Sequence, residues 1–312
     1  PCTVEGLACS EVRRECCEVT EERGCNEEGN VVLIDTCGGS GVVIEECEAN
    51  AECHEGACRC SQGWTGEDCS TCVRYVNGTL GDDANNGRSW ATAVETIAQG
   101  NELVNTDFCQ LWVAAGTYRP TSATEPLLRL RYRQAYGGFA GHERSPEERD
   151  IRANPTILSG DIGVIGDPED NAATVVTMVG WRARFDGFEV NDCSESGMIV
   201  SGGVENVVAN SVFRRNRQSA IVVTENIRVV SSEFHDNSSR YYGGAISSSS
   251  VSASVEVFSS LFIGNHADSG GAIGHWMGGR VEIVDSDFIE NNSLNLASVV
   301  YLTGASYPIV AE

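Results

Sequence analysis

The chain has 312 residues, a formal net charge of −24 and a hydrophobic fraction of 41%. This length predicts one elongated domain and a smaller one, with enough apolar residues for a continuous core. All 21 basic residues are arginine, which excludes catalysis by a lysine amine. The acidic surface argues against binding nucleic acid or an anionic membrane. The sequence contains no run of 18 apolar residues, so it predicts no membrane span.

Residues 1–72 hold twelve of the 14 cysteines. Such a density in a short stretch predicts a disulfide-rich module, which in turn indicates an oxidising environment outside the cytoplasm. We therefore expect an extracellular or cell-surface protein. Zinc is the alternative for clustered cysteines, but His54 is the one histidine among them and zinc-finger spacing is absent from the sequence.

The spacing Cys47-x5-Cys53-x4-Cys58-x-Cys60-x8-Cys69, together with the residues 63–68 (GWTGED), resembles the second half of an epidermal-growth-factor-like module, over 37–69. The resemblance implies three disulfides, namely Cys37–Cys53, Cys47–Cys58 and Cys60–Cys69. A hairpin closed by Cys25 and Cys37 is a competing prediction for the same region. Cys72 and Cys109 flank the next segment and are candidates for a disulfide that joins it to the module.

Residues 73–110 are expected to lead into the large domain. The amphipathic stretch Val94–Val104 predicts a helix, which would cap the open end of a coil of strands and protect unpaired strand edges. The side chains of Asp82, Asp83 and Asn85 precede Gly87 in a pattern similar to a calcium loop of oxygen ligands. A hydrogen-bonded turn is the alternative, and calcium is the one cofactor that the sequence suggests.

The motif Phe-x-x-Asn recurs through the second half of the chain. The copies are Phe188–Asn191, Phe213–Asn216, Phe234–Asn237, Phe262–Asn265 and Phe288–Asn291. Their spacing of 21 to 28 residues predicts stacked structural units, and the short β-branched runs between polar turns predict strands. If each repeat forms one turn of a coil, equivalent residues lie about 4.8 Å apart, so the phenylalanines form an internal column and the asparagines form a hydrogen-bonded ladder. We expect this coil over 111–312, with irregular first turns.

A second motif lies between some of the copies, at 243–246 (GGAI) and 270–273 (GGAI). Together with Phe-x-x-Asn it resembles the repeats of polymorphic outer-membrane proteins and related secreted bacterial surface proteins. The resemblance covers 188–291 directly, and 81–93, 111–118 and 136–143 are similar to the same group. It implies an all-β fold, a right-handed parallel β-helix of the pectin-lyase-like type, with an N-terminal capping helix.

The favoured function is a structural or adhesive surface protein whose rigid rod associates with itself, into a fibre or coat, or with other extracellular proteins. No catalytic residue is predicted. The alternative is a lyase or binding module for acidic polysaccharide, because Arg182, Arg184 and Arg214 form a basic stripe beside Asp186. A solvated, salt-bridged flank would explain the same residues without a ligand.

Overall fold

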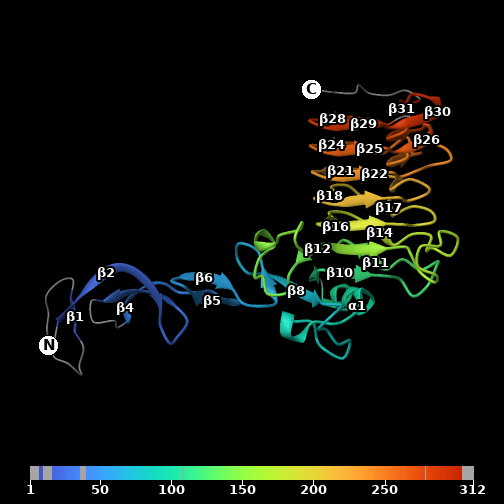
Figure 1. The fold of residues 1–312 in the computed structure, drawn as a ribbon. Coiled ribbons are helices and arrows are strands. Elements are labelled where there is room, and N and C mark those ends of the chain that lie inside the picture. The colour runs from blue at the N-terminus through green and yellow to red at the C-terminus, as the bar shows by residue number, and fades with distance from the viewer. Residues whose placement is uncertain (1–6, 10–15, 36–39, 108, 278, 304–312) are drawn as a thin grey trace. The chain divides into compact units, whose positions relative to one another are not determined.

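The computed structural model describes residues 7–9, 16–35, 40–107, 109–277 and 279–303 (Figure 1). The chain divides into two compact units, 1–73 and 74–312. Among the described residues, every helix is too short or too polar to cross a membrane.

The first unit consists of short antiparallel strands held by disulfides. A four-stranded sheet contains β1 (Leu7–Cys9), β2 (Cys16–Cys25), β3 (Val31–Asp35) and β4 (Ser40–Glu45), and a hairpin contains β5 (Ala51–His54) and β6 (Ala57–Cys60), followed by β7 (Trp64–Thr65). Three disulfides of this unit are Cys25–Cys53, Cys47–Cys58 and Cys60–Cys69. They suit a small unit that has too few apolar residues for a core of its own.

The disulfides correct two predictions. Cys53 is bonded to Cys25, so both the Cys37–Cys53 pair and the Cys25–Cys37 hairpin are wrong. The reason is that β2 and β3 form a hairpin in which Cys25 lies opposite Val31, and the backbone N–H of Cys53 donates to Gly29 in its turn. Cys37 itself lies outside the described residues. Cys72 and Cys109 are each disulfide-bonded.

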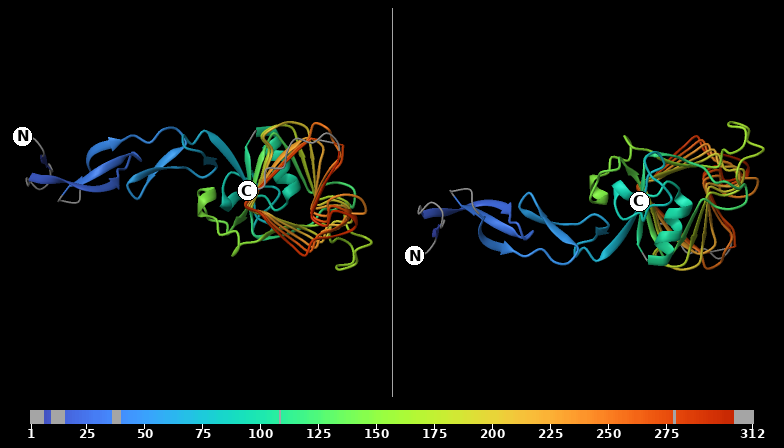
Figure 2. Two further views of the ribbon diagram at one scale, coloured as in Figure 1. Left: turned by 90° about the horizontal axis from the view of Figure 1, so that it is seen from above. Right: turned by 90° about the horizontal axis from the view of Figure 1, so that it is seen from below.

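The second unit is a coil in which each turn contributes one strand to each of three parallel sheets (Figure 1, Figure 2). Sheet 1 contains β8 (Thr71–Val76), β9 (Gln110–Ala114), β12 (Gln134–Phe139), β15 (Arg184–Asp186), β18 (Val207–Ala209), β21 (Asn226–Val230), β24 (Ser254–Phe258) and β28 (Arg280–Val284). Sheet 2 contains β10 (Gly116–Tyr118), β13 (Thr156–Ser159), β16 (Phe188–Asn191), β19 (Val212–Arg214), β22 (Glu233–His235), β25 (Leu261–Ile263) and β29 (Asp287–Ile289). Sheet 3 contains β11 (Leu128–Arg131), β14 (Val176–Val179), β17 (Met198–Ser201), β20 (Ile221–Val223), β23 (Ile246–Ser248), β27 (Ile273–His275) and β31 (Val300–Leu302). A further pair, β26 (His266–Ser269) and β30 (Asn292–Leu296), extends two of the later turns.

The predicted stack of parallel strands is thus confirmed. The alternation of buried and exposed side chains along each strand explains why these residues form it. In β20 the side chains of Ile221 and Val223 are buried, while Val222 is half-exposed on the outer face. β-Branched residues pack well on such a pleated surface. The inner side chains of all three sheets fill one continuous core.

The helix α1 (Ile97–Asp107) packs against β9 and β11 and lies across the first end of the coil, as the view from below shows (Figure 2). Thr96 caps this helix, because its Oγ1 accepts the backbone N–H of Gln99 at 3.1 Å. Two short 3-10 helices, η1 (Trp90–Thr92) and η2 (Pro146–Glu148), complete the regular structure.

Aromatic rings and amides form two columns along the later turns. The rings of Phe213, Phe234, Phe262 and Phe288 stack with centroids 5.2, 4.7 and 4.7 Å apart, and all three steps are within 7° of parallel. At the corner between sheets 2 and 3, each asparagine Nδ2 donates to the next asparagine Oδ1, through the pairs Asn216–Asn237, Asn237–Asn265 and Asn265–Asn291. The same Oδ1 atoms also accept the preceding asparagine's backbone N–H, so the buried corner is hydrogen-bonded throughout.

The predicted first step of both columns is wrong. β16 and β19 pair Val190 with Phe213, so Phe188 and Asn191 lie two residues out of register. The Cys193 backbone N–H, rather than one from Asn191, donates to Asn216 Oδ1 at 3.2 Å. Cys193 therefore stands at the head of the amide ladder, and burial raises the pKa of its thiol to about 12.

A second polar column, of serines, was not predicted. It lies at the corner between sheets 1 and 2, where the backbone N–H of each serine donates to the Oγ of the serine one turn later, through Ser211, Ser232, Ser260 and Ser286. Each of these hydroxyls donates in turn to the carbonyl two residues before it. The hydroxyls thus satisfy corner groups that the strand ladders leave unpaired.

Candidate functional site

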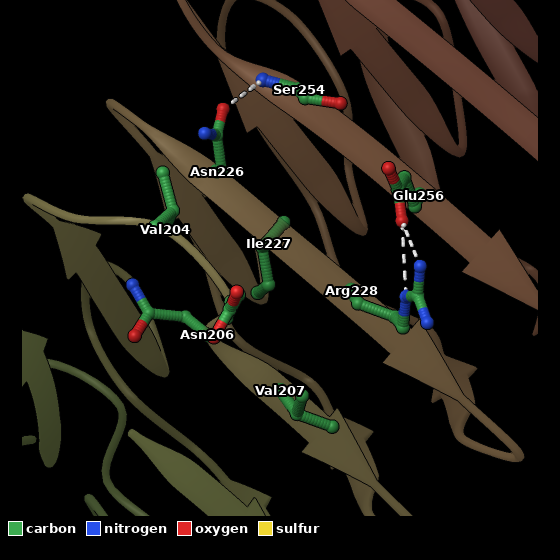
Figure 3. Close-up of a pocket in the computed structure, with 9 residues that line it drawn as sticks. Val204, Asn206, Val207, Asn226, Ile227, Arg228, Ser254 and Glu256 are labelled. Carbon is green, nitrogen blue, oxygen red and sulfur yellow. Dashed lines mark hydrogen bonds and ion pairs between the residues drawn. The ribbon is translucent and has the colours of Figure 1, made fainter. Parts of the chain in front are cut away.

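A cleft of ≈ 520 Å³ opens at the loops that join sheet 3 to sheet 1 (Figure 3). Its floor is formed by the first residues of β18, β21 and β24. The lining residues are Val204, Glu205, Asn206, Val207, Asn226, Ile227, Arg228, Ser254 and Glu256. Parallel strands that begin at the same edge bring these side chains together from three successive turns of the coil.

The charged side chains of the cleft are paired with one another. Arg228 donates through Nε and Nη2 to Oε2 of Glu256, at 3.0 and 2.8 Å (Figure 3). Arg280 donates to Oε1 of the same carboxylate at 3.0 Å. The Arg228 guanidinium also lies 5.3 Å from the centre of the Phe258 ring. These contacts fix the side-chain positions and leave the guanidinium edges at the surface, since Arg228 is 55% exposed.

Amide and hydroxyl groups form the rest of the polar lining. Asn206 is buried and holds the loop, because its Oδ1 accepts the Ala183 N–H and its Nδ2 donates to the Gly202 carbonyl. Asn226 accepts the Ser254 N–H at 2.9 Å (Figure 3). The Ser254 hydroxyl has no hydrogen-bond partner within the part of the chain that the structure describes. A buried hydroxyl in that state is unusual.

Two exposed aromatic side chains, Tyr132 and Trp181, stand on the turns that precede the cleft, and we call them the aromatic ridge. Trp181 lies against Gly203, next to the lining residue Val204, and Tyr132 lies one turn earlier, against Gly180. Tyr132 is 61% exposed and Trp181 is 63% exposed, and they stand on successive turns of the coil. Glycines make room for both rings: a Cβ at Gly180 would collide with Tyr132, and one at Gly203 would collide with Trp181. The ridge is therefore built into the turns, which also carry φ values of 97° and 78° at these glycines.

Arg182 connects the ridge to the cleft. Its backbone N–H donates to the Val204 carbonyl at 3.0 Å, and its Nε donates to Glu205 at 2.6 Å. Of the four residues predicted for a sugar site, it is the one at the cleft. Its side chain is 79% exposed.

The other three predicted residues do not join it. Asp186 is 1% exposed and is bound by Arg184 at 2.6 Å and by Arg149 at 3.1 Å, which makes it part of a buried ion cluster on sheet 1. Arg214 lies on sheet 2, 3.6 Å from Glu189. The basic stripe is thus divided among separate ion pairs.

The proposed calcium ligands serve the backbone. Asp83 accepts the N–H groups of Glu95 and Thr96, and Asp82 accepts that of Ala84, while Asn85 donates to the Ala93 carbonyl. Within the described ranges, no group of three or more histidine, cysteine or acidic side chains is arranged to hold a metal ion. This segment is a hydrogen-bonded turn that leads into α1.

Sequence reasoning missed Trp181, Asn226 and Ser254. The tryptophan that directly follows a glycine, at Gly180–Trp181, was the available signal. The amide and hydroxyl groups gave no signal, because asparagine and serine are ordinary turn residues throughout the chain.

Comparisons with known proteins add little to this description. No family model matches the chain, and no curated protein matches it. One solved structure that it resembles is a pectin methylesterase from Aspergillus niger, with a TM-score of 0.35 and 11% sequence identity, over 79% of this chain and 93% of the esterase. At that TM-score the likeness carries no argument about activity.

Proposed function

We propose that this protein is an extracellular polysaccharide-binding β-helix that holds its ligand in the cleft, along the aromatic ridge, without catalysis. The observation that carries this proposal is the placement of two exposed aromatic rings on the turns that precede a cleft lined by both apolar and hydrogen-bonding groups. The disulfides of the first unit support the location, because they form and persist in oxidising compartments. We infer right-handed winding, the hand of nearly all parallel crossovers.

Sugar rings suit this surface physically. A pyranose has an apolar C–H face and a rim of hydroxyls, so it matches an exposed aromatic ring next to hydrogen-bonding groups. Here the rings of Tyr132 and Trp181 offer the apolar contact, while Arg228 and Asn226 offer hydrogen-bonding groups. Because ridge and cleft extend over consecutive turns, the surface favours a linear polymer over a compact small molecule.

Binding is favoured over hydrolysis or elimination by the state of the charged groups. A general acid or base must reach the substrate with a free proton or lone pair. Both carboxylates of the cleft, Glu205 and Glu256, are paired with arginines, and we assign them to positioning those arginines rather than to proton transfer. Adhesion through bound glycan would follow from this activity, whereas assembly into a fibre or coat stays a prediction.

The test is a calorimetric titration of the whole chain with cellohexaose, mannohexaose, xylohexaose and hexagalacturonate. We expect at least one of them to bind, and Trp181→Ala to weaken that binding at least tenfold, since it removes the larger aromatic surface. Leu80→Ala is the matched control, because Leu80 is also exposed, at 82%, but lies outside the cleft. Failure of all four sugars to bind, or equal binding by the two variants, would refute the proposal.

A further inference from the structure

A second pocket lies on the same turns of the coil, at the other end of the sheet 3 strands. Its volume is ≈ 280 Å³. It is lined by Ser196, Gln218, Ser219, Val222, Ser239, Tyr241, Tyr242, Ser247, Ser248 and Ser249, and we call it the serine–tyrosine pocket. The lining contains no charged side chain, although the protein carries a net charge of −24.

The outer face of sheet 3 continues this uncharged character. Parallel registration places one residue of each strand in a row across the face, and from β14 onward this row is Thr177, Ile199, Val222, Ser247, Gly274 and Tyr301. Sheets 1 and 2 differ, because charged residues stand on their outer faces, as at the paired Arg228 and Glu256 on sheet 1 and at Glu189 and Arg214, which form an ion pair on sheet 2. The row on sheet 3 carries a charge only at its start, where Arg129 of β11 precedes Thr177.

Aromatic stacking holds one wall of the pocket in place. The Tyr242 ring lies 4.9 Å from the Trp276 ring and 5.7 Å from the Tyr301 ring, and it is within 5° of parallel to the latter. A Cβ at Gly274 would lie only 2.6 Å from the Tyr242 Cβ, so glycine is required where the neighbouring strands carry Ser247 and Tyr301. Tyr241, beside it, is 70% exposed.

The hydroxyls of the pocket are partly uncommitted. Ser196 and Ser219 donate to the carbonyls of Gln218 and Tyr242. Ser248, in contrast, is 3% exposed and shares its row with the core residues Val223 and His275, so its side chain faces the core. The hydroxyls that a ligand in the pocket can reach include those of Ser247, which is half-buried on the outer face, and Ser249, which is exposed.

We propose that the serine–tyrosine pocket binds one uncharged sugar ring, as a site separate from the cleft. A cation would find no carboxylate here, and a polyanion would be repelled by the net charge of the protein. A purely apolar ligand would leave the serine hydroxyls without partners. A neutral polyhydroxylated ring pairs with the hydroxyls and the Gln218 amide, and it covers the exposed Tyr241 ring. This inference rests on the residues of the pocket and not on the cleft.

The experiment uses the full chain with the three neutral hexasaccharides and hexagalacturonate, and it measures affinity by calorimetry. Ser247→Asp places a charge at the outer edge of the pocket, and Tyr241→Ala removes the exposed ring. We expect each change to weaken neutral-sugar binding at least tenfold, and the unchanged protein to prefer the best neutral sugar over hexagalacturonate at least tenfold. Ser252→Asp is the matched control, since Ser252 is exposed and lies outside the pocket.

The outcomes separate the two sites. Loss of neutral-sugar binding in Ser247→Asp and Tyr241→Ala, with binding by Ser252→Asp unchanged, supports the proposal of a sugar site in the pocket, whatever the effect of Trp181→Ala. If Trp181→Ala alone weakens binding, the proposal for the pocket is overturned and the cleft remains as the binding site. A preference for hexagalacturonate, or equal weakening by Ser247→Asp and Ser252→Asp, would also overturn it. Circular dichroism of each variant identifies any that fails to fold, and Tyr241→Phe, which keeps the ring, should then retain binding.

Discussion

The later turns of the coil, 207–291, and the early turns, 110–193, reach the same architecture by different means. In the later turns, one set of contacts repeats: stacked phenylalanines, an asparagine ladder and a serine ladder. In the early turns, contacts that occur once replace them. Arg149 forms a buried ion pair with Asp186 and lies over the rings of Tyr136 and Phe139.

This difference shows how a coil can tolerate irregular loops. A ladder needs every turn to have the same length between its corners, so it forbids insertions there. A single ion pair or capping carboxylate has no such requirement. The early turns can therefore contain an inserted loop, such as the one between β12 and β13 that contains Glu143 and Arg149. The regular turns therefore make the coil stiff, while the irregular turns accommodate loops of different lengths.

The largest effect is expected in the asparagine ladder. Asn265→Ala removes a side chain that donates to Asn291 Oδ1 and the Phe234 carbonyl and accepts two hydrogen bonds from Asn237. Leaving these buried groups unpaired should lower the free energy of unfolding by about 4 kcal/mol. Urea unfolding measures this loss. Asn292→Ala, an exposed neighbour, should cost under about 0.5 kcal/mol, and similar losses in both would contradict the ladder.

A somewhat smaller effect is expected in the early turns. Asp186→Asn leaves the Arg149 guanidinium, 8% exposed, without its counter-ion, which should cost about 3 kcal/mol. Asp192→Asn is the control, because the Asp192–Arg215 pair is more exposed and should contribute under about 1 kcal/mol. Raising the salt concentration should shrink the second effect but not the first. Equal effects would mean that the buried cluster has no special role.

The smallest effect is a pH dependence at Glu143. Burial raises the pKa of this carboxyl, but the backbone N–H groups of 140–143 outweigh burial, so the net pKa is lowered. A lowered pKa adds stability that is present above the unfolded value of about 4.3 and is lost as pH falls through the folded value. Hydrogen exchange of the amides of 140–142 should therefore accelerate below about pH 4, after correction for intrinsic rates. In Glu143→Gln that acid-dependent step should vanish, and its persistence would exclude Glu143 as the cause.

The repeat was predictable from the sequence, but its first copy was not. Phe-x-x-Asn occurs at 188 by coincidence. The alignment of one turn of the coil with the next is set by corner residues with positive φ, which lie five positions apart in each turn. In later turns the longer motif Ser-x-Phe-x-x-Asn lies between these corners, as from Ser211 to Asn216. Position 186 is Asp instead of Ser, so the longer motif would have excluded Phe188.

The candidate site was far less predictable. Arg182 was found because arginine is conspicuous, yet its predicted partners Asp186 and Arg214 lie elsewhere. The groups that line the cleft are brought together by registration between turns, which depends on loop lengths that vary from one turn to the next. The uncharged face of sheet 3 likewise arises from residues far apart in the sequence, such as Thr177 and Tyr301.

The most direct test of the central claim is hydroxyl-radical footprinting of the whole chain with and without a saturating hexasaccharide. If a glycan lies along the aromatic ridge, oxidation of Trp181 should fall several-fold on binding, whereas Trp64, in the first unit, should react as before. Binding by calorimetry with undiminished oxidation of Trp181 would contradict the account.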